Sequence, residues 1–233
     1  MTESKLAFVS WSGGKDCCLA ACRASVSGLE IRYLLNMVTE DGTRSRSHGL
    51  STTLLQTQAQ AMGIPLLQRP ATRDAYEAEF IEVLRSLKQQ GVNDGIFGDI
   101  DFNAHREWID RVCSESGIVP HLPLWEENQS KLLREFIDLG FEAVIVATQA
   151  DLLGAEWLGR KIDNTFLQDL AELSKTRKIT PCGEAGEYHT LVIDGPMFRK
   201  KLEILKTAQI LRDSHWFLDI SEARLREKQP RKE

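Results

Sequence analysis

The sequence has no uncharged apolar run of 18 residues, and its opening, MTESKLAFVS, holds no apolar stretch of signal-peptide length. A membrane-spanning helix and a secretory leader are therefore not expected, and we predict a cytoplasmic protein. The five cysteines form no CxxC pair, which argues against a disulfide framework and against a structural zinc site. We expect all five to be reduced thiols.

The chain also has no excess of positive charge. Lys and Arg number 29 against 34 Asp and Glu, a net charge of -5, so no surface for duplex nucleic acid is expected. The content of 42% hydrophobic and 27% charged residues is typical of a globular protein. No repeat or low-complexity linker divides the 233 residues, which predicts one large domain or two smaller ones packed together.

Strand-like and helical patterns alternate through residues 1–124. The expected strands are 5–10, 30–38, 64–69, 94–100 and 118–124, and the expected helices are 15–27, 50–62, 73–90 and 102–116. In the third helix, Tyr76, Phe80, Leu84 and Leu87 share one face, and Gly91 follows as a C-cap. The alternation predicts a Rossmann-like α/β domain, a parallel sheet with flanking helices and right-handed crossovers.

The pattern changes after Trp125. Helices are expected near 126–139 and 163–177, and strands near 141–149, 191–194, 204–211 and 216–220. We predict a smaller α+β substrate-binding domain over 125–222. The remaining segment, 223–233, has little apolar surface and is predicted to be a mobile tail.

The stretch AFVSWSGGKDCC, residues 7–18, joins the first strand to the first helix. Gly13 and Gly14 let the backbone curl around an anion, and Lys15 adds a positive charge at the helix N-terminus. Asp16 would cap the first turn, orient Lys15 or contact Mg²⁺. No GxxxxGK[ST] loop and no GxGxxG fingerprint occurs, so neither common nucleotide template applies. The alternative is an ordinary glycine-rich turn with solvated charges.

The segment SWSGGKDCC resembles the SGGKDS loop of the PP-loop ATP pyrophosphatases, with Cys17 where the usual serine stands. Further blocks identify the chain as a member of the diphthine–ammonia ligase family, in its short single-module form. The blocks are HGLSTTLLQTQAQAMGIPL (48–66), GIFGDIDFNAHREWIDRVC (95–113), LPLW (122–125), WLGRKID (157–163) and CGEAGEYHTLVIDGPMF (182–198). The last block usually reads GEGGEYET, so Ala185 and His189 are departures.

The resemblance implies a PP-loop fold of the adenine nucleotide alpha hydrolase type and an ATP-dependent amide ligase. Such an enzyme adenylates a carboxylate, transfers ammonia to it and releases AMP and pyrophosphate, with ATP and Mg²⁺ as cofactors. The acceptor implied is diphthine on elongation factor 2 in a eukaryote or archaeon, and it is unknown otherwise. Two alternatives are a PP-loop pyrophosphatase acting on a tRNA base or small metabolite, and a non-catalytic nucleotide sensor. The compact chain is compatible with a homodimer.

Loop chemistry, position at the ends of the expected parallel strands and the resemblance together give the candidate residues. Lys15, Asp16 and Glu187 would be catalytic, with Glu187 as ammonium ligand or base and Asp16 as the metal ligand. The residues expected to bind the nucleotide are Ser10, Ser12, Gly13, Gly14, Lys15, Asp16, Cys17, Asn36, Met37 and His48. Those expected on the acceptor side are Asp99, Asn103, Arg106, Gly183, Glu184, Gly186, Glu187 and Tyr188. For the glycine- and glutamate-rich loop the alternative is a solvated surface turn, and for Tyr188 and His48 it is a packing or loop role.

Overall fold

The computed structural model describes residues 5–228 and divides into two compact units. The first unit holds Met1–Thr52 and Ile64–Asn128, and the second holds Thr53–Gly63 and Gln129–Glu233. Helix α2 (Thr52–Met62) belongs from Thr53 onward to the second unit, whose four-stranded sheet is smaller than the five-stranded sheet of the first, as expected. The Gln58 side chain in α2 donates to the Val192 carbonyl at 2.8 Å and thereby ties the helix to this unit.

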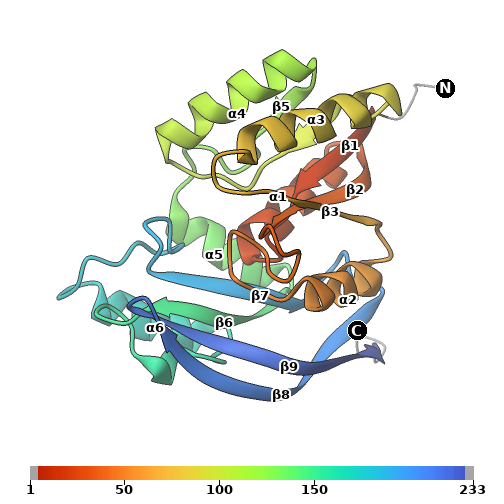
Figure 1. The fold of residues 1–233 in the computed structure, drawn as a ribbon. Coiled ribbons are helices and arrows are strands. Elements are labelled where there is room, and N and C mark those ends of the chain that lie inside the picture. The colour runs from red at the N-terminus through yellow and green to blue at the C-terminus, as the bar shows by residue number, and fades with distance from the viewer. Residues whose placement is uncertain (1–4, 229–233) are drawn as a thin grey trace. The chain divides into compact units, whose positions relative to one another are not determined.

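The first unit is built on a five-stranded parallel sheet of order β3-β2-β1-β4-β5 (Figure 1), which confirms the predicted α/β fold. Its strands are β1 (Lys5–Ser10), β2 (Leu29–Val38), β3 (Leu66–Pro70), β4 (Asp94–Ile96) and β5 (Val119–His121). Its helices are α1 (Lys15–Val26), α3 (Tyr76–Gln89) and α4 (Asn103–Ser116). The two expected strands 94–100 and 118–124 are thus shorter than predicted.

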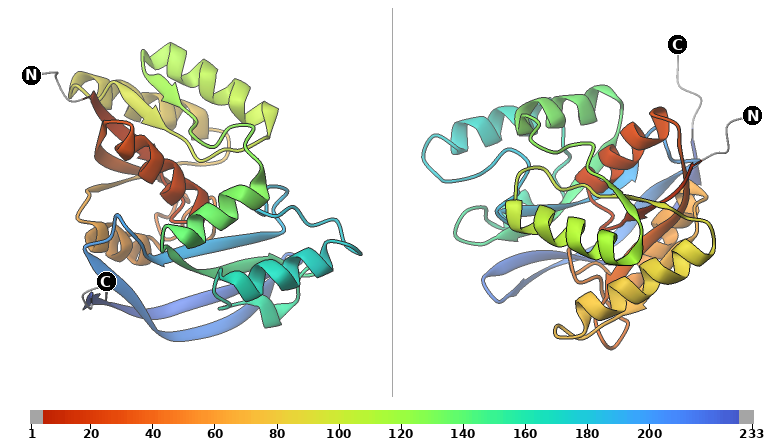
Figure 2. Two further views of the ribbon diagram at one scale, coloured as in Figure 1. Left: turned by 180° about the vertical axis from the view of Figure 1, so that it is seen from behind. Right: turned by 90° about the horizontal axis from the view of Figure 1, so that it is seen from above.

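Alternation along β1 assigns the helices to the two faces of this sheet. Phe8 belongs to one cluster with Phe80 of α3 and Ile109 of α4, and these two helices lie side by side (Figure 2). Its neighbours Ala7 and Val9 are also fully buried, and they point to the opposite face, which α1 covers. The sheet is therefore covered on both faces, as parallel sheets require.

The second unit contains a four-stranded antiparallel sheet of order β7-β6-β9-β8. Its strands are β6 (Glu142–Gln149), β7 (Tyr188–Asp194), β8 (Lys200–Arg212) and β9 (His215–Glu227). Its other helices are α5 (Gln129–Asp138), the short 3₁₀ helix η1 (Ala155–Trp157) and α6 (Asn164–Leu173). The α+β fold class predicted for the C-terminal part of the chain is thereby confirmed.

The last two strands form a hairpin that is longer than predicted. Residues 200–212 pair with residues 215–227 along the whole length of β8. The prediction of a mobile tail is therefore wrong for 223–227, because backbone pairing with β8 holds these residues although few of their side chains are apolar. Residues 229–233 lie outside the described part of the chain.

The longest helices, α3 and α4, have 14 residues each. Across residues 5–228, no helix combines the length and the apolar character needed to cross a membrane. All five cysteines are buried free thiols, in agreement with the sequence prediction.

The packing of α3 gives a first prediction. Phe80 is 1% exposed and contacts the rings of Tyr76 and Trp108, with centroids 6.2 Å and 5.1 Å away. We expect Phe80→Ala to lower the free energy of unfolding by about 3–5 kcal/mol, because it leaves a cavity between α3 and α4. Val26→Ala, at a position that is 85% exposed, should change it by less than about 0.5 kcal/mol. Urea unfolding measures both, and equal effects would contradict the assigned core face.

Candidate nucleotide site

The first candidate site lies where the strand order of the parallel sheet reverses. The chain moves from β1 outward to β2 and β3 and then returns to β4 on the other side of β1. The loops that follow β1 and β4 therefore separate in opposite directions at the carboxyl edge of the sheet. Open α/β sheets bind ligands in the crevice at this point. The loop after β1 is the predicted phosphate loop, and the loop after β4 contains Gly98 and Asp99.

The phosphate loop has the conformation that an anion cradle requires. Gly13 adopts a φ of +81°, in the left-handed region that favours glycine. Gly14 is the N-cap of α1 and has no side chain to cap the helix, so the amides of the first turn point toward the carboxyl edge of the sheet. Inside the loop, the Ser12 hydroxyl accepts from the Gly14 amide at 3.3 Å.

Cys17, at the position where a serine is usual, bonds to residues of the loop itself. Its thiol donates to the Gly14 carbonyl at 3.2 Å and accepts from the Ser12 hydroxyl at 3.4 Å. Burial alone would raise the pKa of Cys17, but hydrogen bonds with Cys18 and Ser12 hold it below its usual value. The side chain is only 5% exposed, so its place in this structure is inside the loop.

Two carboxylates and one ammonium meet at the start of α1. Lys15 Nζ lies 3.0 Å from Asp16 Oδ2, and Lys15 is 3% exposed. Burial raises the pKa of Asp16, the Lys15 charge opposes that rise, and the Asp99 carboxylate adds to it. Asp99 is therefore close enough to act on Asp16, although the two residues come from the loops after different strands. An arrangement of this kind is stabilised by a cation between the two carboxylates.

The β4 loop approaches the phosphate loop at Gly98. A Cβ atom at this position would lie 2.7 Å from the Cys17 amide nitrogen and 2.9 Å from the Asp16 carbonyl carbon. Real Cβ atoms do not come so close to backbone, so only glycine lets the two loops touch. The contact places Asp99, the next residue, beside the first turn of α1.

The end of β2 contributes a buried polar group. Asn36 is 1% exposed, and its side-chain amide donates to the Trp11 carbonyl at 2.7 Å and to the Ser45 hydroxyl at 2.9 Å. Its Oδ1 has no hydrogen-bond partner within the described residues. The carbonyl of Met37 accepts from the Arg46 amide, and His48 is half-buried in the same loop. A buried acceptor with no donor marks a position where a ligand can supply one.

Sequence reasoning missed two residues at this edge of the sheet, Arg46 and Tyr76. Burial raises the pKa of the Tyr76 phenol, which the charges of Arg46 and Asp99 shift in opposite directions. Arg46 is anchored by a hydrogen bond to the Ala71 carbonyl at 2.9 Å. The signal that could have identified Arg46 is its place in the loop after the second parallel strand. Tyr76 was recognised from the sequence only as a core residue.

The predicted acceptor-side residues of the first unit lie around Asp99. His105 Nδ1 is 3.0 Å from Asp99 Oδ1, and Asn103 is exposed at the start of α4. The Arg106 guanidinium donates to Asp110 at 2.9 Å and lies 5.3 Å from the centre of the Trp125 ring. Asn103 and Arg106 thus share the first turn of one helix, and their role toward an acceptor stays a prediction.

The remaining predicted residues belong to the loop before β7 in the second unit. Glu187 is 1% exposed, and its carboxylate accepts from the Thr180 amide at 2.5 Å and from the Ala185 amide at 2.9 Å. These bonds occupy one lone pair on each oxygen and close the loop on itself. The geometry favours a loop-ordering role for Glu187 over the predicted contact with ammonium.

The glycines of this loop are required by its backbone. Gly183 and Gly186 have φ of +73° and +84°, and a Cβ on Gly183 would lie 2.7 Å from the Tyr188 carbonyl oxygen. Tyr188 is buried, donates to the Pro181 carbonyl and packs edge-on against Phe166. Of the two roles considered for Tyr188, the structure supports packing rather than a wall of the acceptor pocket. Glu184 is half-buried, and its amide donates to the Thr180 hydroxyl at 2.8 Å.

Gly98 gives a test of the cradle. We expect Gly98→Ala to push the β4 loop away from α1, lowering the free energy of unfolding by about 1–3 kcal/mol and weakening ATP binding about tenfold or more. Calorimetry of ATP binding and thermal unfolding measure the two effects. Gly42→Ala is the matched control, since its Cβ meets nothing within 4 Å and only its φ of +71° is unfavourable. Unchanged ATP affinity in Gly98→Ala would contradict the assignment.

Comparison with known proteins agrees with this geometry. Two family models match in chain order, the diphthamide synthase N-terminal domain over residues 5–120 and the diphthamide synthase C-terminal domain over residues 128–225. Relatives named diphthine–ammonia ligase from Rattus norvegicus, Homo sapiens and Danio rerio are each 29% identical. The alignments cover 92%, 93% and 90% of this chain and 88%, 89% and 90% of the relatives.

The C-terminal match falls on the second unit apart from Asn128, and the N-terminal match spans most of the first unit together with the α2 segment of the second. The glycine-rich loop after β1 lies within the N-terminal match. The resemblance read from the sequence blocks is thereby confirmed. The chain belongs to the diphthamide synthase family, and it is similar to relatives that are named diphthine–ammonia ligase.

Proposed function

We propose that the protein is an ATP-dependent amide ligase that adenylates a carboxylate and transfers ammonia to it. The observation that carries the proposal is the cradle at the sheet switch point, where Gly13, Lys15 and the first turn of α1 meet the Gly98 loop. The relatives are named for diphthine and ammonia, so diphthine is the proposed acceptor, carried on elongation factor 2 if the source is a eukaryote or archaeon. A tRNA base, a small metabolite and a purely sensory role are not favoured by these names.

Two bond exchanges make up the reaction. An acceptor carboxylate oxygen attacks the α-phosphorus of ATP, the bond to the bridging α–β oxygen breaks, and pyrophosphate leaves with that oxygen. The nitrogen of ammonia then attacks the acyl carbon, the bond to the AMP oxygen breaks, and the nitrogen releases protons as the amide forms. Both steps develop negative charge on phosphate oxygens. Stabilisation of that charge by pre-placed donors is the largest contribution the chain can make.

The residues of the cradle divide this work. Lys15 and the amides after Gly14 would hold the departing pyrophosphate, with Ser10 and Ser12 at the mouth of the loop. Because Asp16 orients Lys15 at 3.0 Å, the ammonium is fixed before the substrate arrives and needs little reorganisation.

Asp16 and Asp99 are suited to a magnesium ion that comes with ATP. Burial and the Asp99 charge both raise the pKa of Asp16, and two neighbouring carboxylates suit Mg²⁺, which takes one or two protein carboxylates and completes its shell with phosphates and water. The described residues hold no cluster of three or more His, Cys, Asp or Glu side chains around one metal position, so the phosphates must supply the rest. Bound there, Mg²⁺ would neutralise phosphate charge.

Asn36 offers a contact for the adenine ring. Its Oδ1 is an unpartnered buried acceptor at the end of β2, and the exocyclic amino group of adenine is a donor. Met37 and His48 belong to the same region and stay candidates for the nucleotide pocket. On the acceptor side, Asp99, Asn103 and Arg106 of the first unit are proposed to position the carboxylate. Gly183, Glu184, Gly186, Glu187 and Tyr188 of the second unit stay acceptor-side predictions from the sequence. A homodimer and a cytoplasmic location stay predictions from the sequence.

Lys15→Met tests the cradle chemically. The substitution keeps the apolar stem and removes the charge, so we expect AMP and pyrophosphate release to fall by about 100-fold or more while the chain stays folded. Lys88→Met, at an exposed lysine of α3, is the control and should keep full activity. Release of both products is measured with acceptor and ammonium present. Wild-type rates in Lys15→Met, with a normal circular dichroism spectrum, would refute the proposed site.

Glu187→Gln separates loop ordering from the nucleotide half-reaction. A glutamine can accept from only one of the two amides and presents a donor to the other, which costs about 1–3 kcal/mol of loop order. We expect faster hydrogen exchange of the Ala185 amide. We also expect amide formation to fall more than adenylation, which ATP–pyrophosphate exchange measures. Glu172→Gln, at an exposed glutamate of α6, should change neither. Equal losses in both half-reactions would count against the role of this loop on the acceptor side.

A further inference from the structure

The segment WLGRKID, residues 157–163, lies along the edge of β6, and its backbone explains why the second sheet opens. The Gly159 amide donates to the Ile145 carbonyl at 2.9 Å, the Ile145 amide to the Arg160 carbonyl at 3.0 Å, and the Ile162 amide to the Ala143 carbonyl at 3.0 Å. These bonds occupy the edge of β6 over residues 143–145. Strand β9 therefore pairs with β6 only at Ala147–Gln149, and the β8–β9 hairpin departs from β6 beyond that point.

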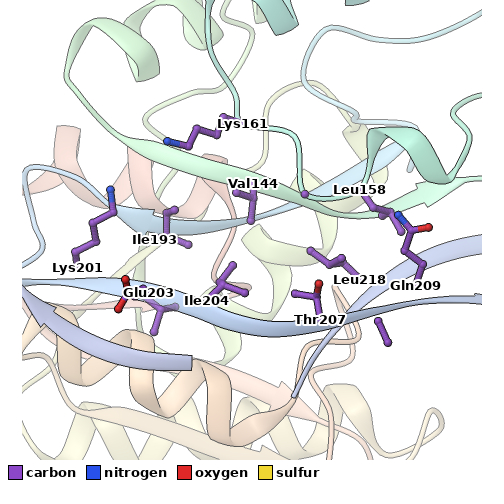
Figure 3. A pocket seen from close by; sticks show the side chains of 13 residues that line it. Val144, Leu158, Lys161, Ile193, Lys201, Glu203, Ile204, Thr207, Gln209 and Leu218 are labelled. Atoms are coloured by element: carbon purple, nitrogen blue, oxygen red, sulfur yellow. The ribbon is translucent and has the colours of Figure 1, made fainter. Parts of the chain in front are cut away.

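A pocket of about 640 Å³ lies in the gap that results (Figure 3). The register of the hairpin shifts twice between Ile204 and Thr207, so β8 bends around the gap. The floor is formed by aliphatic side chains, and no aromatic ring lines the pocket among the residues described. The apolar lining is Val144, Leu158, Ile193, Leu202, Ile204 and Leu218. A volume of this size holds a small organic ligand, and a lining without rings gives no surface for stacking a base.

One end of the pocket is cationic. Lys161 and Lys201 lie together at that end in Figure 3, while Gln209 and Leu158 lie at the other. Both lysines share one carboxylate: Lys201 Nζ is 2.8 Å from each oxygen of Glu142, and Lys161 Nζ is 3.5 Å from Oε2. The Lys161 side chain is 61% exposed and its contact with Glu142 is long, at 3.5 Å, so it can turn toward a ligand.

The second carboxylate at the pocket is already neutralised. Glu203 accepts from Arg224 at 2.6 Å, and Arg226 lies 3.7 Å from its other oxygen. The ion pairs around the pocket thus combine four cations, Lys161, Lys201, Arg224 and Arg226, with the two carboxylates of Glu142 and Glu203. This excess of positive charge favours the binding of an anionic ligand and disfavours a cationic one.

We propose that this pocket binds a small aliphatic carboxylate, with its chain on the apolar floor and its head group between Lys161 and Lys201. The chain gains free energy from leaving water, and the head group exchanges hydration for two ammonium donors at the open end. The pocket lies within the second unit alone, so the proposal does not depend on the ligase reaction. It can be tested without nucleotide, and its failure would leave the proposed function untouched.

Titration of the full chain with octanoate tests the proposal, with octan-1-ol and octylammonium as probes of equal chain length. We expect saturable binding of octanoate, about tenfold or more tighter than binding of either other probe. Calorimetry measures the affinities. Equal affinity for octanoate and octan-1-ol, or no saturable octanoate binding, would overturn the proposal.

Variants test each part of the pocket. Lys161→Met with Lys201→Met should weaken octanoate binding about tenfold or more, and Thr207→Phe should abolish it by filling the cavity. Glu142→Gln removes the carboxylate that competes for both lysines and should strengthen binding about threefold. Lys200→Met is the matched control on the same strand, since Lys200 pairs with Glu227 and does not line the pocket. Unchanged affinity in the double lysine variant, confirmed as folded by circular dichroism, would refute the anion site.

Discussion

The close approach of Gly98 to the first turn of α1 is the constraint on which the nucleotide site depends. Strands β1 and β4 are neighbours in the sheet, but their following loops lead to helices on opposite faces. The two loops can touch only where one residue has no side chain, and Gly98 provides that point. The contact places Asp99 near enough for its charge to act on Asp16, which already pairs with Lys15, and so adds a second carboxylate to the local loop.

This charge arrangement is costly for the folded chain and useful for function. A buried lysine beside a partly buried aspartate loses hydration, and the nearby Asp99 raises the cost of ionising Asp16. In the proposed function, polyphosphate with a divalent cation would satisfy all three groups, because the anion would pair with Lys15 and the cation with the carboxylates. Sites that bind charged ligands commonly hold such perturbed groups. The buried Oδ1 of Asn36 has no hydrogen-bond partner within the described residues, so it is an uncharged group that a ligand could likewise satisfy.

The second unit uses a carboxylate differently. From the sequence, Glu187 is predicted to be an ammonium ligand or base in a loop rich in glycine and glutamate. In the fold its two oxygens hold the amides of Thr180 and Ala185, and the left-handed glycines let the loop close around it. A loop held in this way presents its outer backbone at a fixed position. Its contribution to an acceptor site would therefore be one of positioning.

The sequence by itself determined the features that depend on neighbours along the chain. The parallel sheet, the face of α3 with Phe80, and the glycine–lysine loop at a helix N-terminus all follow from local periodicity and turn chemistry. Tertiary structure alone decided the features that join distant segments. These are the contact of Gly98 with α1, the partners of Glu187, the transfer of α2 to the second unit, and the pocket opened where residues 159–162 displace β9. Such contacts depend on how strands and loops are ordered in space, and residue spacing along one chain does not record that order.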